Sequence, residues 1–189
     1  DLKQEDKAES EEAERSQSNP LLVATKEQKQ HDLLALAKKA GDFFEETAIQ
    51  DSHCAAWAGQ FYAGESRQFN YLDASLYSGQ LGIIWFLAYL GEVTQDKKYQ
   101  NLATKGMRFC LDTLLQYQIL QPAIGLFDGL GSYLYVLSHL QQLIPDQSYQ
   151  TDINKISSLL SEKIHQDEQL DIVGGTAGCL IALQSVYAV

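Results

Sequence analysis

A glycine motif occurs three times in this chain, and each copy opens a strongly apolar run. The copies read YSGQLG at residues 77–82, FDGLGS at residues 127–132 and VGGTAG at residues 173–178. If Gly79, Gly129 and Gly175 are equivalent, successive copies are 50 and 46 residues apart. A repeat of that length indicates one supersecondary unit used several times, because a single unit cannot bury its apolar face alone.

Helical periodicity divides the rest of the chain into two kinds of segment. Helices with one apolar face are predicted where apolar residues recur at three- and four-residue steps, in residues 33–48, 99–117 and 153–164. Helices buried on every side are predicted where the sequence is apolar all round, in residues 83–90, 133–140 and 179–187. The two kinds alternate, and no convincing period-2 run is present. We therefore predict an all-α fold, an α/α toroid of helical hairpins, of which this chain supplies about three.

The segment between the first two predicted helices, residues 51–73, is richer in glycine and turn-forming residues. We expect its large side chains to be buried anchors: Trp57, Phe61, Tyr62 and Phe69. The glycines of the three motifs suit the mouth of a ring, where inner helices begin close together. Only glycine permits close backbone approach or a positive φ there, although packing alone also explains such glycines.

Composition excludes several classes of function. The formal net charge of −11 argues against a nucleic-acid partner and against an anionic membrane surface, both of which need a basic protein face. The longest apolar stretch, residues 83–90, is far too short to span a membrane, and no signal peptide is visible. Cys54, Cys110 and Cys179 are odd in number and widely spaced, which predicts reduced, buried thiols in a cytoplasmic protein.

Two domain regions are predicted. Residues 1–25 are acidic and almost free of large apolar side chains, so we expect a disordered linker. Residues 26–189 form the folded part. The chain begins with Asp1 rather than Met and stops at Val189 inside an apolar run, which indicates that the folded part is truncated at its C-terminus.

Residues 73–91, 125–131 and 171–178 resemble the motifs of the lanthionine synthetase C-like cyclases. A helix followed shortly by Ala55-Ala56-Trp57 also looks like the entry to the cyclase domain of class II lanthipeptide synthetases, the LanM type. The resemblance covers residues 26–189 and implies the N-terminal part of such a domain, preceded in the whole protein by a fused dehydratase domain. One departure is Ser132, which stands where the family often has another glycine.

The resemblance also implies a chemistry. Family members take a dehydrated precursor peptide and add a peptide cysteine thiol to dehydroalanine or dehydrobutyrine, which forms a lanthionine thioether ring. A Zn²⁺ ion held by two cysteines and a histidine, in a Cys-His-Gly context, activates the thiol. None of the four histidines here is followed by glycine: His31, His53, His139 and His165. The resemblance therefore implies zinc ligands beyond residue 189 and no metal ligand within this chain, where His139 is expected to be a core histidine.

One catalytic position carries over from the family, whose active-site aspartate precedes the third glycine motif as Asp171 does here. The resemblance implies that this carboxylate orients a catalytic histidine or relays the proton of the enolate. The alternative is a helix-start aspartate that binds free backbone N–H groups.

Two other classes of function stay open. Asp73, Asp128 and Asp171 all lie near predicted helix starts, and paired carboxylates in an α/α toroid suit a glycoside hydrolase. A non-catalytic helical-repeat binding module has a similar repeat length. Bound zinc in the full-length protein, or a closed ring against an open superhelix, distinguishes the cyclase from these alternatives.

Overall fold

The computed structural model describes residues 25–64, 66–116 and 123–188. The chain divides into two compact units, Asp1–Ala40 and Gly41–Val189. Helix α3 (Lys26–Thr47) begins in the first unit and ends in the second, and the second unit holds everything that follows. The acidic linker expected at residues 1–25 falls almost wholly outside the described residues.

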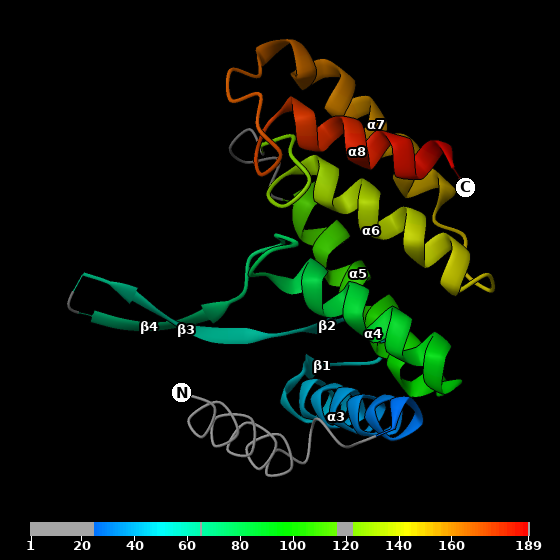
Figure 1. Ribbon diagram of the computed structural model, residues 1–189. Coiled ribbons are helices and arrows are strands. Elements are labelled where there is room, and N and C mark those ends of the chain that lie inside the picture. The colour runs from blue at the N-terminus through cyan, green and yellow to red at the C-terminus, as the bar shows by residue number, and fades with distance from the viewer. Residues whose placement is uncertain (1–24, 65, 117–122, 189) are drawn as a thin grey trace, which may run out of the picture. The chain divides into compact units, whose positions relative to one another are not determined.

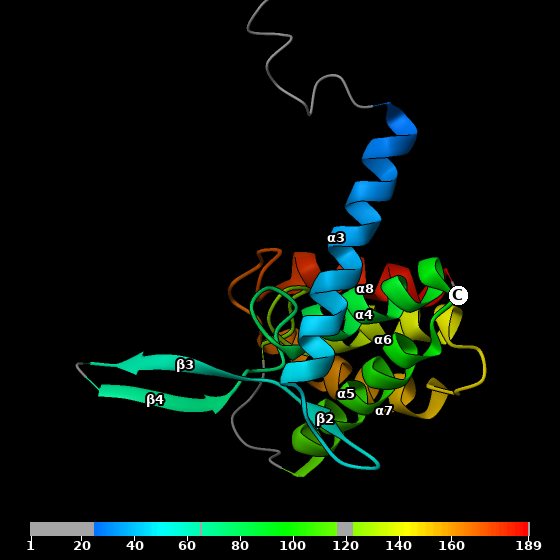
Figure 2. The same cartoon turned by 90° about the horizontal axis from the view of Figure 1, so that it is seen from below.

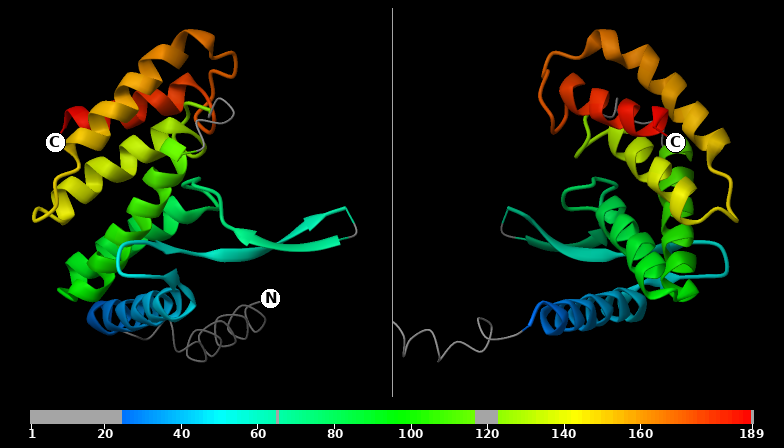
Figure 3. Two further views of the ribbon diagram at one scale, coloured as in Figure 1. Left: turned by 180° about the vertical axis from the view of Figure 1, so that it is seen from behind. Right: turned by 45° about the vertical axis from the view of Figure 1, so that its right-hand side comes forward.

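Among its described residues the second unit contains five further α-helices, as the repeat pattern predicts. They are α4 (Gln80–Thr94), α5 (Lys97–Gln116), α6 (Leu130–Leu143), α7 (Gln150–Lys163) and α8 (Thr176–Tyr187). Helices α4, α6 and α8 lie side by side in this order, with α5 against α4 and α7 against α6 (Figures 1 and 3). The predicted all-α class and the alternation of inner and outer helices are confirmed.

The outer helices bury one stripe each. In α5, Tyr99, Met107 and Cys110 are buried, while Lys97 and Arg108 on the other face are exposed. In α7, three aliphatic side chains are buried at helical spacing: Ile153, Ile156 and Leu160. The apolar stripe that the sequence predicts for each outer helix is thus the face that packs on the inner helices.

The inner helices differ from the prediction that each is buried on every side. Helix α6 lies between α4 and α8, and its central leucines Leu134 and Leu137 are fully buried. On α4, however, Tyr89 is 37% exposed, and on α8 Leu180 is 60% exposed. The expectation is therefore correct only for α6, because only α6 has an inner helix on both sides within the described residues.

In the described part of the chain before α4 there are two β-hairpins, which the sequence did not predict. Strand β1 (Ile49–Gln50) pairs with β2 (Ala55–Ala56), and β3 (Ala58–Ala63) pairs with β4 (Ser66–Tyr71). The longer hairpin extends away from the helices (Figure 2). Both of its faces meet solvent, so its sequence lacks the alternation of apolar and polar residues that identifies a half-buried strand.

The hairpin also corrects the set of buried anchors. Trp57 is buried as expected, and its indole Nε1–H donates to the carbonyl oxygen of Phe44 at 2.8 Å. Phe61, Tyr62 and Phe69 are exposed instead, with Phe69 at 77%. These three aromatic residues lie on the strands of the hairpin, beyond the reach of the helical core.

Candidate functional site at the starts of the inner helices

The three repeated glycines occupy the same place in the fold. Gly79, Gly129 and Gly175 are the N-cap residues of α4, α6 and α8 respectively. The equivalence that the sequence suggests is therefore confirmed, and the repeating unit is a loop, an N-cap glycine and an inner helix.

Backbone hydrogen bonds join the three glycine loops to one another. Leu76 N–H donates to the carbonyl oxygen of Phe127 at 2.9 Å, which joins the first loop to the second. Leu126 N–H donates to the carbonyl oxygen of Ile172 at 3.2 Å, which joins the second loop to the third. The starts of all three inner helices thus meet at one end of the unit, where their dipoles add partial positive charge.

Asp171 lies in the third loop, at the start of α8, with its side chain exposed. Its Oδ1 atom accepts hydrogen bonds from the N–H groups of Gly174 at 2.8 Å and Gly175 at 3.0 Å. Its backbone carbonyl accepts from Gly178 N–H at 3.1 Å. These contacts hold the carboxylate in a defined position beside the helix start. The two N–H groups belong to the N-cap glycine and to the residue before it, whereas the side chain of an N-cap residue accepts from the second or third helical residue.

Of the other two aspartates of the predicted set, Asp73 resembles Asp171 in its contacts and Asp128 does not. Asp73 Oδ1 accepts from Ser75 N–H at 2.9 Å, and the Asp73 carbonyl accepts from Gln80 N–H at 2.7 Å. Asp128 is exposed next to the N-cap Gly129. All three carboxylates thus lie at the end where the inner helices begin, but Asp73 and Asp171 each bind backbone N–H groups of their own loops.

Asp167 is a residue of this site that the sequence analysis missed. Its Oδ2 atom accepts from Thr176 N–H at 2.7 Å and also from the Thr176 hydroxyl. The Thr176 hydroxyl and the surrounding N–H groups lower the pKa of the Asp167 carboxyl. Asp167 lies nine residues before Thr176, well outside the spacing of an ordinary N-cap, so no local pattern identifies it.

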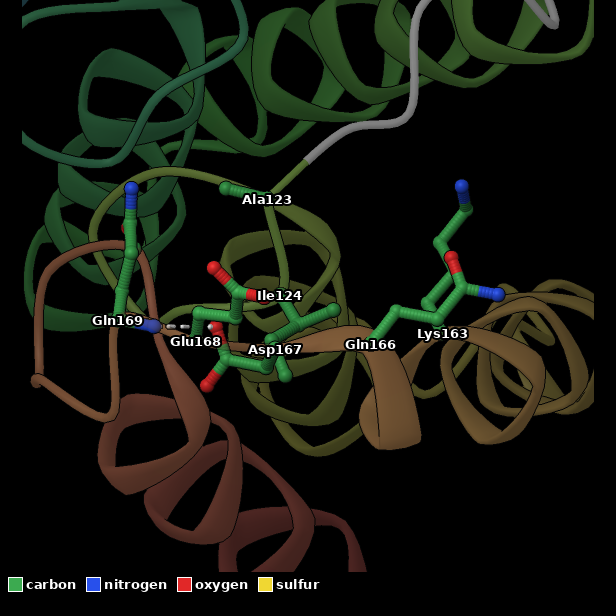
Figure 4. A pocket seen from close by; sticks show the side chains of 8 residues that line it. Ala123, Ile124, Lys163, Gln166, Asp167, Glu168 and Gln169 are labelled. Carbon is green, nitrogen blue, oxygen red and sulfur yellow. Dashed lines mark hydrogen bonds between the residues drawn. The ribbon is translucent and has the colours of Figure 1, made fainter.

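A cavity of about 360 Å³ lies beside this loop (Figure 4). Lys163, Asp167 and Glu168 give it charged walls of both signs, and Gln169 and Gly174 complete the side nearest the third loop. Asp171 is not among its lining residues. The cavity is therefore a polar recess next to the loop, and the Asp171 carboxylate lies outside it.

The described residues do not fit the zinc site that the family resemblance implies. Among them, no three His, Cys, Asp or Glu side chains are grouped so that they could hold a metal ion. Cys110 and Cys179 are buried and Cys54 is half-buried, all as free thiols. Burial raises the pKa of the Cys110 thiol to about 12, whereas a metal ligand must be a thiolate.

His139 has the surroundings of a core histidine. Its Nδ1 atom lies 2.8 Å from the hydroxyl of Tyr89, and its ring packs against Trp85 and Tyr135. Burial lowers its pKa, so the neutral imidazole is favoured. His139 thus packs between α4 and α6, but it is half-buried and not satisfied as a core histidine would be, because its Nε2 atom is buried with no hydrogen-bond partner among the described residues.

Inner helices that begin at glycine N-caps and pack against amphipathic outer helices define an all-α protein built from helical hairpins. The family model described as lanthionine synthetase C-like protein matches residues 70–189, which is more than half of the chain. The chain therefore belongs to the lanthionine synthetase C-like family, which is associated with lanthionine cyclase activity on precursor peptides. No curated protein matches this chain.

The family match extends from the end of β4 to the C-terminal end of the chain and includes all three glycine motifs. Within the part of the chain that the structure describes, no helix combines the length and apolar character needed to cross a membrane.

Proposed function

We propose that this chain is part of the cyclase domain of a class II lanthipeptide synthetase. In this proposal the domain adds cysteine thiols of a dehydrated precursor peptide to dehydroalanine or dehydrobutyrine. The observation that carries the proposal is the Asp171 carboxylate, which two backbone N–H groups hold at the end where the inner helices begin. The family match across residues 70–189 supports the reaction class.

The reaction places specific demands on these residues. The thiolate sulfur supplies the electron pair of a new bond to the β-carbon of the dehydro residue. The π bond between the α- and β-carbons breaks, and its electron pair moves through the α-carbon onto the carbonyl oxygen. The resulting enolate then takes a proton at the α-carbon. Asp171 is the group that relays this proton or orients the histidine that delivers it. The positive ends of the inner helices favour the negative charge that develops on the enolate.

In this proposal, zinc binding and peptide dehydration are carried out by residues other than those described. Zinc, which the family generally binds, supplies thiolate at neutral pH when it is present, and its ligands are proposed to lie elsewhere in the full-length protein. A dehydratase domain fused before the cyclase is likewise part of the proposal. A cytoplasmic location is proposed from the odd number and wide spacing of the cysteines.

The test is Asp171→Asn in the full-length enzyme. We expect this variant to keep its zinc content and to receive normally dehydrated peptide, but to form thioether rings about 10²- to 10⁴-fold more slowly, because a positioned proton-transfer group is lost. Asparagine caps helices well, so a purely capping role would cost little stability. Free cysteines are counted over time by thiol alkylation and mass spectrometry.

The matched control for this test is Asp128→Asn. Asp128 is also exposed at the end where the inner helices begin, and its replacement removes the same charge. The control variant should form rings at the wild-type rate. A wild-type rate in Asp171→Asn would show that Asp171 is a structural cap and would remove the proposed catalytic group. Neither alternative class gains support from the geometry, since Asp73 and Asp171 each bind their own loops.

A further inference from the structure

We propose that Asp167 and Thr176 form a clamp that positions Asp171 for catalysis. The inference rests on the proposed function of Asp171 and adds a positioning residue that does not itself touch the peptide. The clamp closes the loop of residues 167–176 at its base. Asp171 lies near the middle of that loop.

The contacts of Asp167 converge on the two ends of this loop. At the start, its Oδ1 accepts from Gln169 N–H at 3.2 Å and its Oδ2 accepts from Leu170 N–H at 3.2 Å. At the far end, Oδ2 also binds both the N–H and the hydroxyl of Thr176. One carboxylate therefore joins the beginning of the loop to the first residue of α8.

The backbone just before Asp171 makes the loop depend on this clamp. Leu170 has φ 57°, in the left-handed region that residues other than glycine avoid. Its side chain is 66% exposed, so packing does not hold this conformation. The hydrogen bond from Leu170 N–H to Asp167 is the described contact that holds it. Loss of the clamp releases the residue that sets the direction of Asp171.

The other side of the loop is already fixed by the neighbouring repeat. Gly174 is buried, and its carbonyl oxygen accepts from Ile124 N–H at 3.1 Å and from Gly125 N–H at 2.9 Å. The carbonyl oxygens of Ile172 and Val173 also accept hydrogen bonds from the second loop, from Leu126 N–H at 3.2 Å and from Phe127 N–H at 3.1 Å. The second loop therefore holds the backbone that follows Asp171, and the clamp holds the backbone that precedes it. Residues 170–173 are exposed.

The three repeats provide an internal comparison. The first helical residue after each N-cap glycine is Gln80 in α4, Leu130 in α6 and Thr176 in α8. Only the third repeat has a hydroxyl there, and only the third repeat carries the aspartate proposed to act in catalysis. The hydroxyl is thus found where a clamp is needed and not at the other two helix starts.

The experiment uses the full-length enzyme and its own dehydrated precursor peptide. Thr176→Val removes the hydroxyl but keeps the backbone N–H and the size of the side chain. We expect kcat for ring formation to fall about 10- to 100-fold with KM within twofold, because a small displacement of a catalytic group has an effect of this order. Thr176→Ser restores the hydroxyl and should recover kcat. A purely structural role would lower the melting temperature and leave kcat unchanged.

A double variant separates positioning from other effects. If the clamp acts through Asp171, the Thr176→Val/Asp171→Asn enzyme should be no slower than Asp171→Asn alone. If the fold-losses in kcat of the two single variants multiply in the double variant, the clamp is overturned. A kcat for Thr176→Val within twofold of wild type would also overturn it. If Thr176→Val does not fold, Asp167→Asn, nearly equal in shape, tests the same contacts. A wild-type rate in Asp171→Asn overturns the catalytic role of Asp171, on which the clamp rests, and is visible in that single variant.

Discussion

At the scale of single residues, the N-cap glycines are required for two different reasons. Gly129 has φ 127°, a conformation that side chains rarely adopt. Gly79 and Gly175 have extended backbones, so conformation does not restrict them. A Cβ at Gly79 would instead collide with the backbone of Asp73, and one at Gly175 with the backbone of Asp171. Close approach of the loop to the helix start thus requires glycine at both.

Gly129→Ala is predicted to destabilise the protein by about 2 kcal/mol or more, because it combines backbone strain with a collision against Ala123. Gly64→Ala is the matched control, since Gly64 also has a positive φ, 64°, but nothing lies within 4 Å of an added Cβ. That change should cost no more than about 1 kcal/mol. Urea unfolding of both variants gives the comparison, and equal effects would contradict the steric explanation.

Ser132 stands where Gly82 and Gly178 stand in the other repeats, at the third helical position. Its hydroxyl oxygen is buried and has no hydrogen-bond partner among the described residues. Ser132→Ala should therefore stabilise the fold by about 1 kcal/mol, since it removes an unsatisfied polar group and keeps the volume. Ser75→Ala is the control: that hydroxyl accepts from Ser78 N–H at 3.2 Å, and its loss should destabilise. A lower urea midpoint for Ser132→Ala would contradict this account.

At the scale of elements, the start of α8 is stabilised by charge. The folded pKa of Asp167 is lowered, so its capping contribution is present above the ordinary aspartate pKa of about 3.9 and is lost as the pH falls through the lower folded value. The Thr176 amide resonance should therefore shift with a midpoint below pH 3.9 in an NMR titration. Asp167→Asn should abolish that shift, and a midpoint above 3.9 would contradict the assigned hydrogen bonds.

At the scale of the whole molecule, α8 and the loop before it expose several large apolar side chains, as do α3 and the hairpin of β3 and β4. On α8, Leu180 is 60% exposed and the next residue, Ile181, is also exposed. In the loop before α8, Ile172 and Val173 are exposed. Helix α6, in contrast, is covered on both sides by inner helices. Exposed apolar side chains on neighbouring positions promote association between protein molecules.

We therefore expect the 189-residue chain to self-associate or to bind a hydrophobic dye in dilute solution. Leu180→Ser/Ile181→Ser should reduce both, because it replaces two exposed apolar side chains on one helix. Val93→Ser is the control, since Val93 is 65% exposed but belongs to α4 and not to α8 or the loop before it. Analytical ultracentrifugation and dye fluorescence are the measurements. A monodisperse monomer with a sharp cooperative melt and no dye binding would contradict this expectation.

The sequence alone determined the helices and their order. Six helices were predicted by apolar periodicity and by glycine spacing, and both are local properties of the chain. Gly79, Gly129 and Gly175 could be equated from the sequence because each precedes an apolar run. The place of Asp171 before the third glycine motif is also visible in the sequence, but its proposed catalytic role comes from the resemblance to the family.

Tertiary structure decided what depends on contacts between distant residues. The hairpin of β3 and β4 has no buried face, so its residues carry no alternating pattern, and Phe69 was placed in the core by its apolar character alone. Which inner helix is fully covered depends on its neighbours and not on its own composition, as α6 and α8 show. Asp167 reaches Thr176 only because the loop folds back on itself. The two residues are nine positions apart, and no helical or strand periodicity in the sequence relates them.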